Sequence, residues 1–153
     1  MHELSQETIN ATFLDVVEQL TYMFGEPVPK DDLDTEMVEF TLARMSFIGD
    51  MPGTLSVAVP TRITAEIAAN ILGLEAEDLS DKAMLDDALG EMLNVVCGHV
   101  IMALVGTEAN FKLNSPVVRV LDETLLLEML ADPAVVGFDL DDNPVLLGLT
   151  TEN

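Results

Sequence analysis

Apolar residues recur at the spacing of an amphipathic helix along residues 6–24. At about 100° per residue these positions share one face, as a helix buried on one side requires. They are Ile9, Phe13, Val16, Val17, Leu20 and Met23. Gly25, Pro27 and Pro29 follow, and these helix-breaking residues predict that the helix ends near Phe24.

The pattern then changes to the period of a β-hairpin. From Val38 to Ile48 apolar and polar residues alternate, as in a strand that buries one face. Residues 50–53 (Asp-Met-Pro-Gly) are a turn signal. A returning strand is predicted from the apolar positions that follow at a period of two, Leu55, Val57 and Val59.

Two further helices are predicted, one short and one long. The short helix covers residues 61–72, with Thr61 as its N-cap and Gly73 stopping it. The long helix covers residues 80–105 and starts at Ser80, a second candidate N-cap.

The last third of the chain predicts short elements and a second hairpin. The expected segments are a strand at residues 117–121, a short helix or strand at 125–130, and hairpin strands at 135–140 and 145–150. Helices that alternate with hairpins favour an α+β fold, with two long helices packed on a mostly antiparallel sheet. No linker or low-complexity segment interrupts residues 1–153, so a single domain is expected.

The two halves of the chain share a helical motif and a later hairpin. Each long helix carries a Glu, then a residue three positions on, then a Gly four positions further. The matched sets are Glu18, Thr21 and Gly25 in the first helix and Glu91, Asn94 and Gly98 in the second. This similarity predicts an internal repeat related by a pseudo-two-fold axis.

The charge of the chain excludes several classes of partner. There are 28 acidic residues against 6 basic ones, a formal net charge of −22. Nucleic acid and anionic membranes need Lys or Arg to replace their counterions, so neither is expected as a partner. The acidic residues are spread along the chain, which is typical of a strongly solvated surface.

A cytoplasmic location is expected from several features. The N-terminus has no basic segment followed by an apolar one. The longest uncharged apolar stretch, Val95 to Gly106, is shorter than the ~20 residues of a membrane span. The single cysteine, Cys97, excludes an internal disulfide and fits a reducing compartment. One cysteine with two histidines, His2 and His99, does not make a zinc site.

The long second helix carries the candidate chemistry. One side of it is apolar at Leu85, Leu89, Met92, Val96, Val100 and Ala103. The opposite side presents a stripe, within about 60°, of Asp87, Glu91, Asn94 and Gly98. The simplest interpretation is an amphipathic helix with a solvated acidic face. However, Asn is a mediocre helix former, and Gly90 and Gly98 each cost up to about 1 kcal/mol relative to Ala.

Asp87, Glu91 and Asn94 are spaced Asp-x-x-x-Glu-x-x-Asn and are followed by Pro116. This pattern resembles the active-site signature of the CheC/CheX/FliY family of chemotaxis phosphatases, although Pro116 comes one residue earlier than in that signature. Other segments resemble the CheX-like branch of the family. They are residues 53–57, 65–73 and 90–98, and the resemblance covers nearly the whole chain.

The resemblance implies a phosphatase that hydrolyses the phosphoaspartate of a CheY-like response-regulator receiver domain. It implies that Asn94 positions the attacking water and that Glu91 pairs with a cationic side chain of the receiver. A neutral amide suits this task because it accepts a hydrogen bond from water without repelling the phosphoryl group. Asp87 is expected to contact the partner. Gly90 and Gly98 are expected to leave the helix backbone open to it.

The same resemblance implies partners and an assembly. The receiver is expected to carry Mg²⁺, so the chain itself needs no metal or cofactor, and a homodimer is expected as in many CheX-like proteins. The first-helix copy has Thr21 in place of the Asn and Leu14 in place of the leading Asp. That copy is therefore expected to be inactive, as in single-site members of the family.

Two other functions fit the same pattern. The chain is an alternative candidate for a non-catalytic module of the same fold, binding a receiver or a component of the flagellar switch. It is also a candidate for a dimerisation or scaffold domain, in which the stripe is only a solvated helix face. Both Glu91 and Asn94 are present, and this favours the enzyme.

Overall fold

The computed structural model describes residues 2–79 and 81–151. The helices are α1 (His2–Thr21), α2 (Thr64–Leu72), α3 (Lys82–Val105) and α4 (Glu123–Ala131). The strands are β1 (Gly25–Val28), β2 (Phe40–Gly49), β3 (Gly53–Pro60), β4 (Phe111–Leu113), β5 (Val117–Val120), β6 (Val135–Leu140) and β7 (Asn143–Thr151). Three single-turn 3₁₀ helices lie at Lys30–Asp32, Thr61–Ile63 and Ala76–Asp78.

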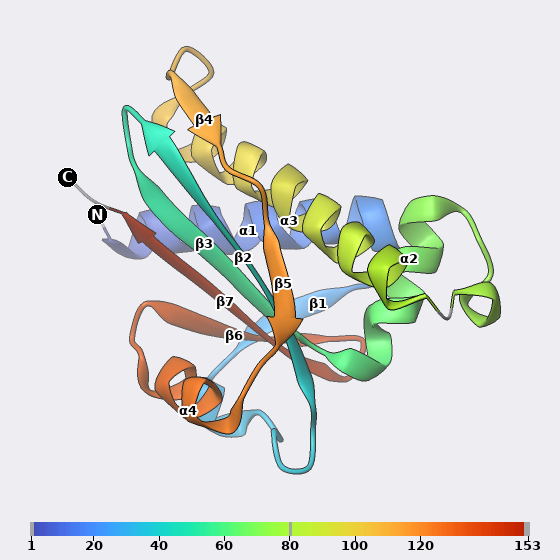
Figure 1. Ribbon diagram of the computed structural model, residues 1–153. Coiled ribbons are helices and arrows are strands. Elements are labelled where there is room, and N and C mark those ends of the chain that lie inside the picture. The colour runs from blue at the N-terminus through green and yellow to red at the C-terminus, as the bar shows by residue number, and fades with distance from the viewer. Residues whose placement is uncertain (1, 80, 152–153) are drawn as a thin grey trace.

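The strands form one seven-stranded antiparallel sheet in the order β1-β6-β7-β3-β2-β4, with β5 also paired to β2. Figure 1 shows α1 and α3 together on one face of this sheet and α4 on the other face. The predicted α+β fold, with two long helices on an antiparallel sheet, is confirmed. The internal pseudo-two-fold repeat stays a prediction.

The main core lies between the two long helices and the sheet. Phe13 of α1 packs against Phe138 of β6, with ring centroids 4.9 Å apart. Side chains alternate along β2, so Met45 and Phe47 face this core while Leu42 faces a smaller cluster beneath α4. Each face of the sheet is therefore at least partly covered, which explains why β2 and β3 contain so many buried residues.

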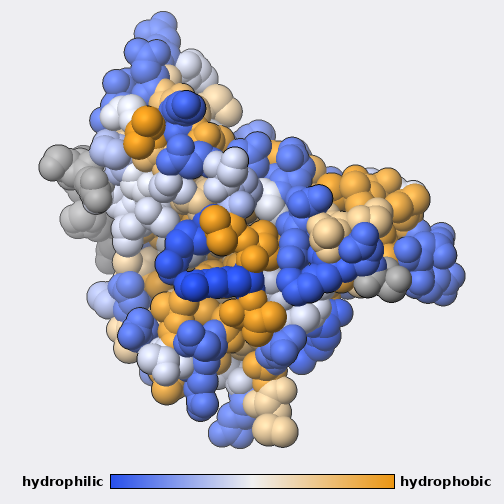
Figure 2. Space-filling view, in the orientation of Figure 1, coloured by the Kyte–Doolittle hydropathy of each residue, from blue (hydrophilic) through white to orange (hydrophobic). Residues whose placement is uncertain are grey.

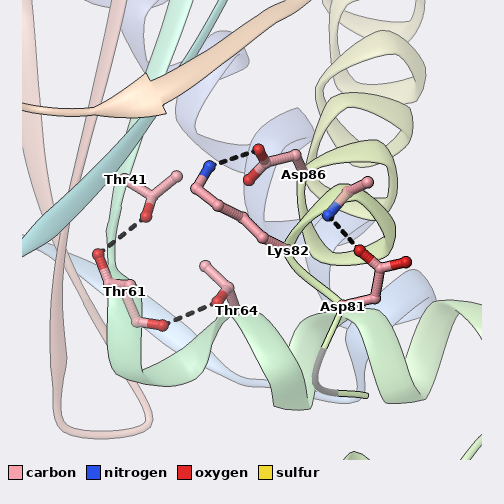
Figure 3. A network of polar contacts seen from close by, with 7 residues as sticks. Thr41, Thr61, Thr64, Asp81, Lys82 and Asp86 are labelled. Carbon is pink, nitrogen blue, oxygen red and sulfur yellow. Dashed lines mark hydrogen bonds and ion pairs between the residues drawn. The ribbon is translucent and has the colours of Figure 1, made fainter.

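Several element boundaries differ from those predicted. α1 ends at Thr21 rather than Phe24, because the Thr21 hydroxyl donates to the Val17 carbonyl and accepts from the Met23 amide. Thr61 was expected to cap a helix and does not: a 3₁₀ turn intervenes, α2 begins at Thr64, and the Thr61 hydroxyl bonds Thr41 at 2.8 Å (Figure 3). Gly73 ends α2 as predicted, with a φ of 71°.

The late segments are confirmed in outline. A strand predicted at residues 117–121 is observed as β5, and the segment at 125–130 is part of helix α4. The hairpin predicted between residues 135 and 150 is β6 with β7. The pattern did not predict β1 or β4, because strands of four and three residues are too short to show a period.

By length and composition alone, α3 could cross a membrane. A span was not predicted from the sequence, because the longest uncharged apolar stretch is too short. The 24 residues of α3 include an apolar window of which half is buried inside the protein. The core helix of a soluble protein has the same properties, so this finding is weak evidence for a span.

The surface of the face shown in Figure 2 is mostly hydrophilic, as the composition requires. Hydrophobic areas interrupt it over β5 and near the end of α2. The exposed apolar residues of these elements are Val117 and Val120 on β5, and Leu72 with the nearby Leu74 at the end of α2.

Candidate functional site

Helix α3 begins with two local interactions that fix its first turn. Ser80, the predicted N-cap, lies outside the described residues. Asp81 occupies the N-cap position, and its carboxylate accepts from the Ala83 amide at 3.0 Å. Lys82 donates to Asp86 at 2.7 Å, one turn along the helix (Figure 3). The carboxylate stripe therefore starts from a well-defined helix end.

The buried face of α3 is wide and packs on α1, α2 and the sheet. Its buried residues are Ala88, Leu89, Gly90, Met92, Leu93, Val96, Cys97, Val100 and Ile101. Ala103 was expected on this face but is exposed. In this last part of the helix Met102 and Val105 are exposed too, so the cover by neighbouring elements does not reach its end.

On the other side, α3 lines an open groove of about 650 Å³. The lining residues of α3 are Asp86, Asp87, Gly90, Glu91 and Asn94, and those of the facing segment are Asn114, Ser115, Pro116 and Val118. The groove thus brings together four of the five predicted site residues with Pro116. Asp87 and Glu91 are exposed, whereas Asn94 is half-buried.

Pro116 forms part of the wall that faces α3 and lies close to Gly90 of the helix. A Cβ atom at Gly90 would lie 3.3 Å from the Pro116 Cγ and 3.5 Å from its Cβ. Gly90 is therefore buried, and its open backbone is used by this chain's own Pro116 rather than left free for a partner. Gly98 differs, because a Cβ there would meet nothing within 4 Å. Gly98 does not line the groove.

Four groove residues were not singled out from the sequence: Asp86, Asn114, Ser115 and Val118. Asn114 continues the pairing of β4 with β2, since its amide donates to the Ser46 carbonyl at 2.9 Å. Its side-chain amide also donates to the Ser46 hydroxyl at 2.6 Å. These hydrogen bonds hold the Asn114–Pro116 segment in place opposite α3. The dipeptide Ser115-Pro116 was the available signal, because Ser-Pro favours a turn.

The groove is acidic, and its exposed carboxylates have no cationic partner among the residues that the structure describes. Over the parts of the chain that the structure describes, Lys82–Asp86 is the only ion pair. Asp87 and Glu91 have none, and at 4 Å or less a Lys or Arg from another molecule would stabilise them. Asn94 lies beside them with an amide that can both accept and donate.

The first-helix copy of the motif has no comparable surface. Thr21 is fully buried, and its hydroxyl is already hydrogen-bonded to Val17 and Met23. Its carbonyl accepts from the Asn70 side-chain amide at 2.5 Å. A water molecule or phosphoryl group has no access to this position. The expectation of a single site on α3 stays a prediction.

Cys97, His99 and metal binding are weaker candidates for chemistry than the groove. Burial raises the pKa of the Cys97 thiol to about 12, so it is protonated at neutral pH and is a poor nucleophile. His99 is exposed while Cys97 is buried, so the two do not act together. Among residues 2–79 and 81–151, no group of three His, Cys, Asp or Glu side chains is placed to hold a metal ion.

Comparison with solved structures assigns the fold to the chemotaxis proteins of the CheX and CheC type. A chemotaxis protein CheX from Desulfovibrio desulfuricans is 15% identical, covers 97% of this chain and 99% of its own, and has a TM-score of 0.69. CheX from Vibrio vulnificus is 17% identical, with 95% of each chain covered and a TM-score of 0.67. A complex of CheX with CheY, BeF3 and Mg²⁺ from Borrelia burgdorferi is 14% identical, with 94% and 97% covered and a TM-score of 0.59.

The family follows from the sequence itself. The family model described as chemotaxis phosphatase CheX matches residues 41–137, which include β3, α3 and all residues that line the groove. The chain belongs to the CheX family of chemotaxis phosphatases. The predicted resemblance is confirmed at the level of the family. A comparison with curated protein sequences finds no match.

Proposed function

We propose that this chain accelerates hydrolysis of the phosphoaspartate in a CheY-like receiver domain in the cytoplasm. Membership of a phosphatase family supports the reaction class. The similar Borrelia protein was crystallised with CheY, which supports the partner. The observation that carries the proposal is the groove itself: Glu91 and Asn94 lie on adjacent turns of one helix, open to solvent and facing Pro116.

The reaction needs little from the phosphatase. Water attacks phosphorus in line, the bond between phosphorus and the aspartate oxygen breaks, and aspartate and inorganic phosphate are released. The proton lost by the water passes to a phosphate oxygen or to solvent. An acyl phosphate is already reactive, so positioning of the water and compensation of charge are the main requirements.

We assign Asn94 to position the attacking water. Its carbonyl oxygen accepts a hydrogen bond from the water, and as a neutral group it does not repel the phosphoryl oxygens. The half-buried position of Asn94 in the groove wall restricts its rotamers. A carboxylate at the same place would add a negative charge beside the phosphoryl group and raise the barrier.

We assign Glu91 to form an ion pair with a cationic side chain of the receiver, the Lys beside its phosphoaspartate. Glu91 is exposed and has no ion-pair partner within the described residues. Pairing across the interface aligns the two active-site halves. Asp87 lies one turn before Glu91 and contacts the rim of the receiver. In this proposal the receiver supplies the Mg²⁺.

The test is the decay of phosphorylated receiver domains in Mg²⁺, with and without the protein. The receivers are the CheY-like domains of the source organism, phosphorylated with acetyl phosphate. Asn94→Ala should remove most of the acceleration, a loss of about 10² or more if water positioning is comparable to general-base catalysis. Asn94→Asp, of equal size, should be no better than Asn94→Ala.

Asp87→Asn serves as the matched control because it removes a groove charge outside the assigned chemistry. It should change the receiver concentration needed for half-maximal rate more than the maximal rate. Full activity of Asn94→Ala would contradict the water assignment. Binding of receivers without faster decay would instead favour the non-catalytic module. The expected homodimer is checked separately by light scattering.

A further inference from the structure

The exposed face of α3 continues past the groove as an apolar strip. Glu91, Gly98, Met102 and Val105 lie within a sector of about 60° around the helix. Met102 is 40% exposed and Val105 is 38% exposed. Between them and the groove, Gly98 leaves the backbone open, with nothing within 4 Å of its Cβ direction. We call Gly98, Met102 and Val105 the apolar extension.

This strip is unusual because α3 is already buried on its other side. On a helix that is buried along one face, the opposite face is normally charged or polar. Here the inner face is buried in the core, while the last turns present Met102 and Val105 to water. Methionine adapts its shape to irregular surfaces and is frequent where proteins bind one another. The strip therefore has the composition of a contact surface.

Charge gives a second reason to expect an apolar contact here. The chain carries a net charge of −22, and its groove contains Asp86, Asp87 and Glu91. The residues that line the groove include no Lys or Arg, so the groove does not attract the phosphoryl group at long range. Affinity has to come from short-range contacts, and burial of apolar area is the main non-directional one.

We propose that the apolar extension is the docking surface for the receiver domain whose phosphoaspartate faces Asn94. This inference rests on the proposed function. Val105 lies eleven residues beyond Asn94, about 16 Å along the helix axis. A domain of about 100 residues has a radius of gyration of about 13 Å. One receiver can thus place its phosphoaspartate at the groove and cover the extension at the same time.

The experiment separates docking from chemistry. The double variant Met102→Ala, Val105→Ala is compared with wild type for KM and kcat towards the phosphorylated receivers. The expected result is a rise in KM of about tenfold with kcat unchanged, as when binding contacts are lost but the reacting groups stay in place. Leu127→Ala on α4, which is 60% exposed, is the matched control and should change neither constant.

Binding is measured in parallel by titration with the receivers carrying BeF₃⁻ and Mg²⁺, which mimic the phosphorylated state without turnover. Weaker binding of the double variant, with Leu127→Ala unchanged, supports the extension even if wild type does not accelerate decay. In that case only the phosphatase proposal fails. Equal binding and equal KM for the double variant and wild type would overturn the docking surface. An absence of any binding by wild type would overturn both proposals.

Discussion

Replacing each of the two helical glycines by alanine gives a paired test of the groove geometry. In a helix interior, Gly is destabilising by roughly 0.5–1 kcal/mol relative to Ala, because it loses more backbone freedom on folding. At Gly98 the new methyl group meets nothing within 4 Å. Gly98→Ala is therefore expected to raise the free energy of unfolding by about 0.5–1 kcal/mol.

At Gly90 the same gain is opposed by Pro116. The new Cβ would lie 3.3 Å from the Pro116 Cγ and 3.9 Å from a methyl group of Val118, so the first contact is closer than ordinary van der Waals distance. Pro116 must move by a few tenths of an ångström, and the strain offsets most of the gain. Gly90→Ala is expected to leave the free energy of unfolding within about 0.5 kcal/mol of wild type.

Urea denaturation measures both variants, and receiver decay assays measure their activity. Gly90→Ala should lower kcat because it displaces the wall opposite Asn94, whereas Gly98→Ala should raise KM because its methyl group stands on the docking surface. If Gly90→Ala were stabilised as much as Gly98→Ala and kept full activity, Pro116 would not define the groove. Destabilisation by Gly98→Ala would refute the open space at that position.

Three further outcomes follow from the same structure. Burial raises the pKa of the Cys97 thiol from 9.0 to about 12, so the thiol should resist alkylation at pH 8 until the protein is unfolded. The unfolded thiol ionises first, so this contribution to stability is complete below about pH 9 and is lost as pH rises towards about 12, as urea titrations at several pH values would show. The KM for phosphorylated receivers should change little with salt, because apolar contacts do not depend on the screening of charge. A steep rise of KM between low salt and about 0.5 M NaCl would contradict apolar docking. Thr21→Val should reduce the free energy of unfolding by about 1–2 kcal/mol by leaving the buried Met23 amide without its acceptor, and a loss of kcat in the folded variant would show that the first helix contributes to the site after all.

The sequence predicted only the side of the candidate site that α3 forms. Helical periodicity is local, so Asp87, Glu91 and Asn94 could be placed on one face of α3 from their spacing alone. The opposite wall depends on Pro116, which reaches Gly90 because β4 and β5 both pair with β2. β4 is only three residues long, so its pairing has no periodic signal.

The burial of residues along the helices was also predicted only in part. The apolar spacing of α1 correctly indicated its buried residues Ile9, Phe13, Val16 and Val17. It did not show that α1 stops at Thr21, since that end depends on a side-chain hydrogen bond to Val17. For α3, the pattern assigned Ala103 to the core, but the neighbouring elements leave the last turns of the helix exposed.

Apolar periodicity and charge were sufficient to predict the two long helices, the hairpins, the acidic surface and the order of carboxylate and amide groups along α3. These properties depend on the period of apolar residues and on charge, which are read within a few neighbouring positions. The packing of distant segments was needed to show that Pro116 fills the space beside Gly90, that Gly98 is open, and that Met102 and Val105 are exposed. Those outcomes depend on which distant segment packs against each position, and the strand pairing that brings the segments together is a long-range property of the sheet.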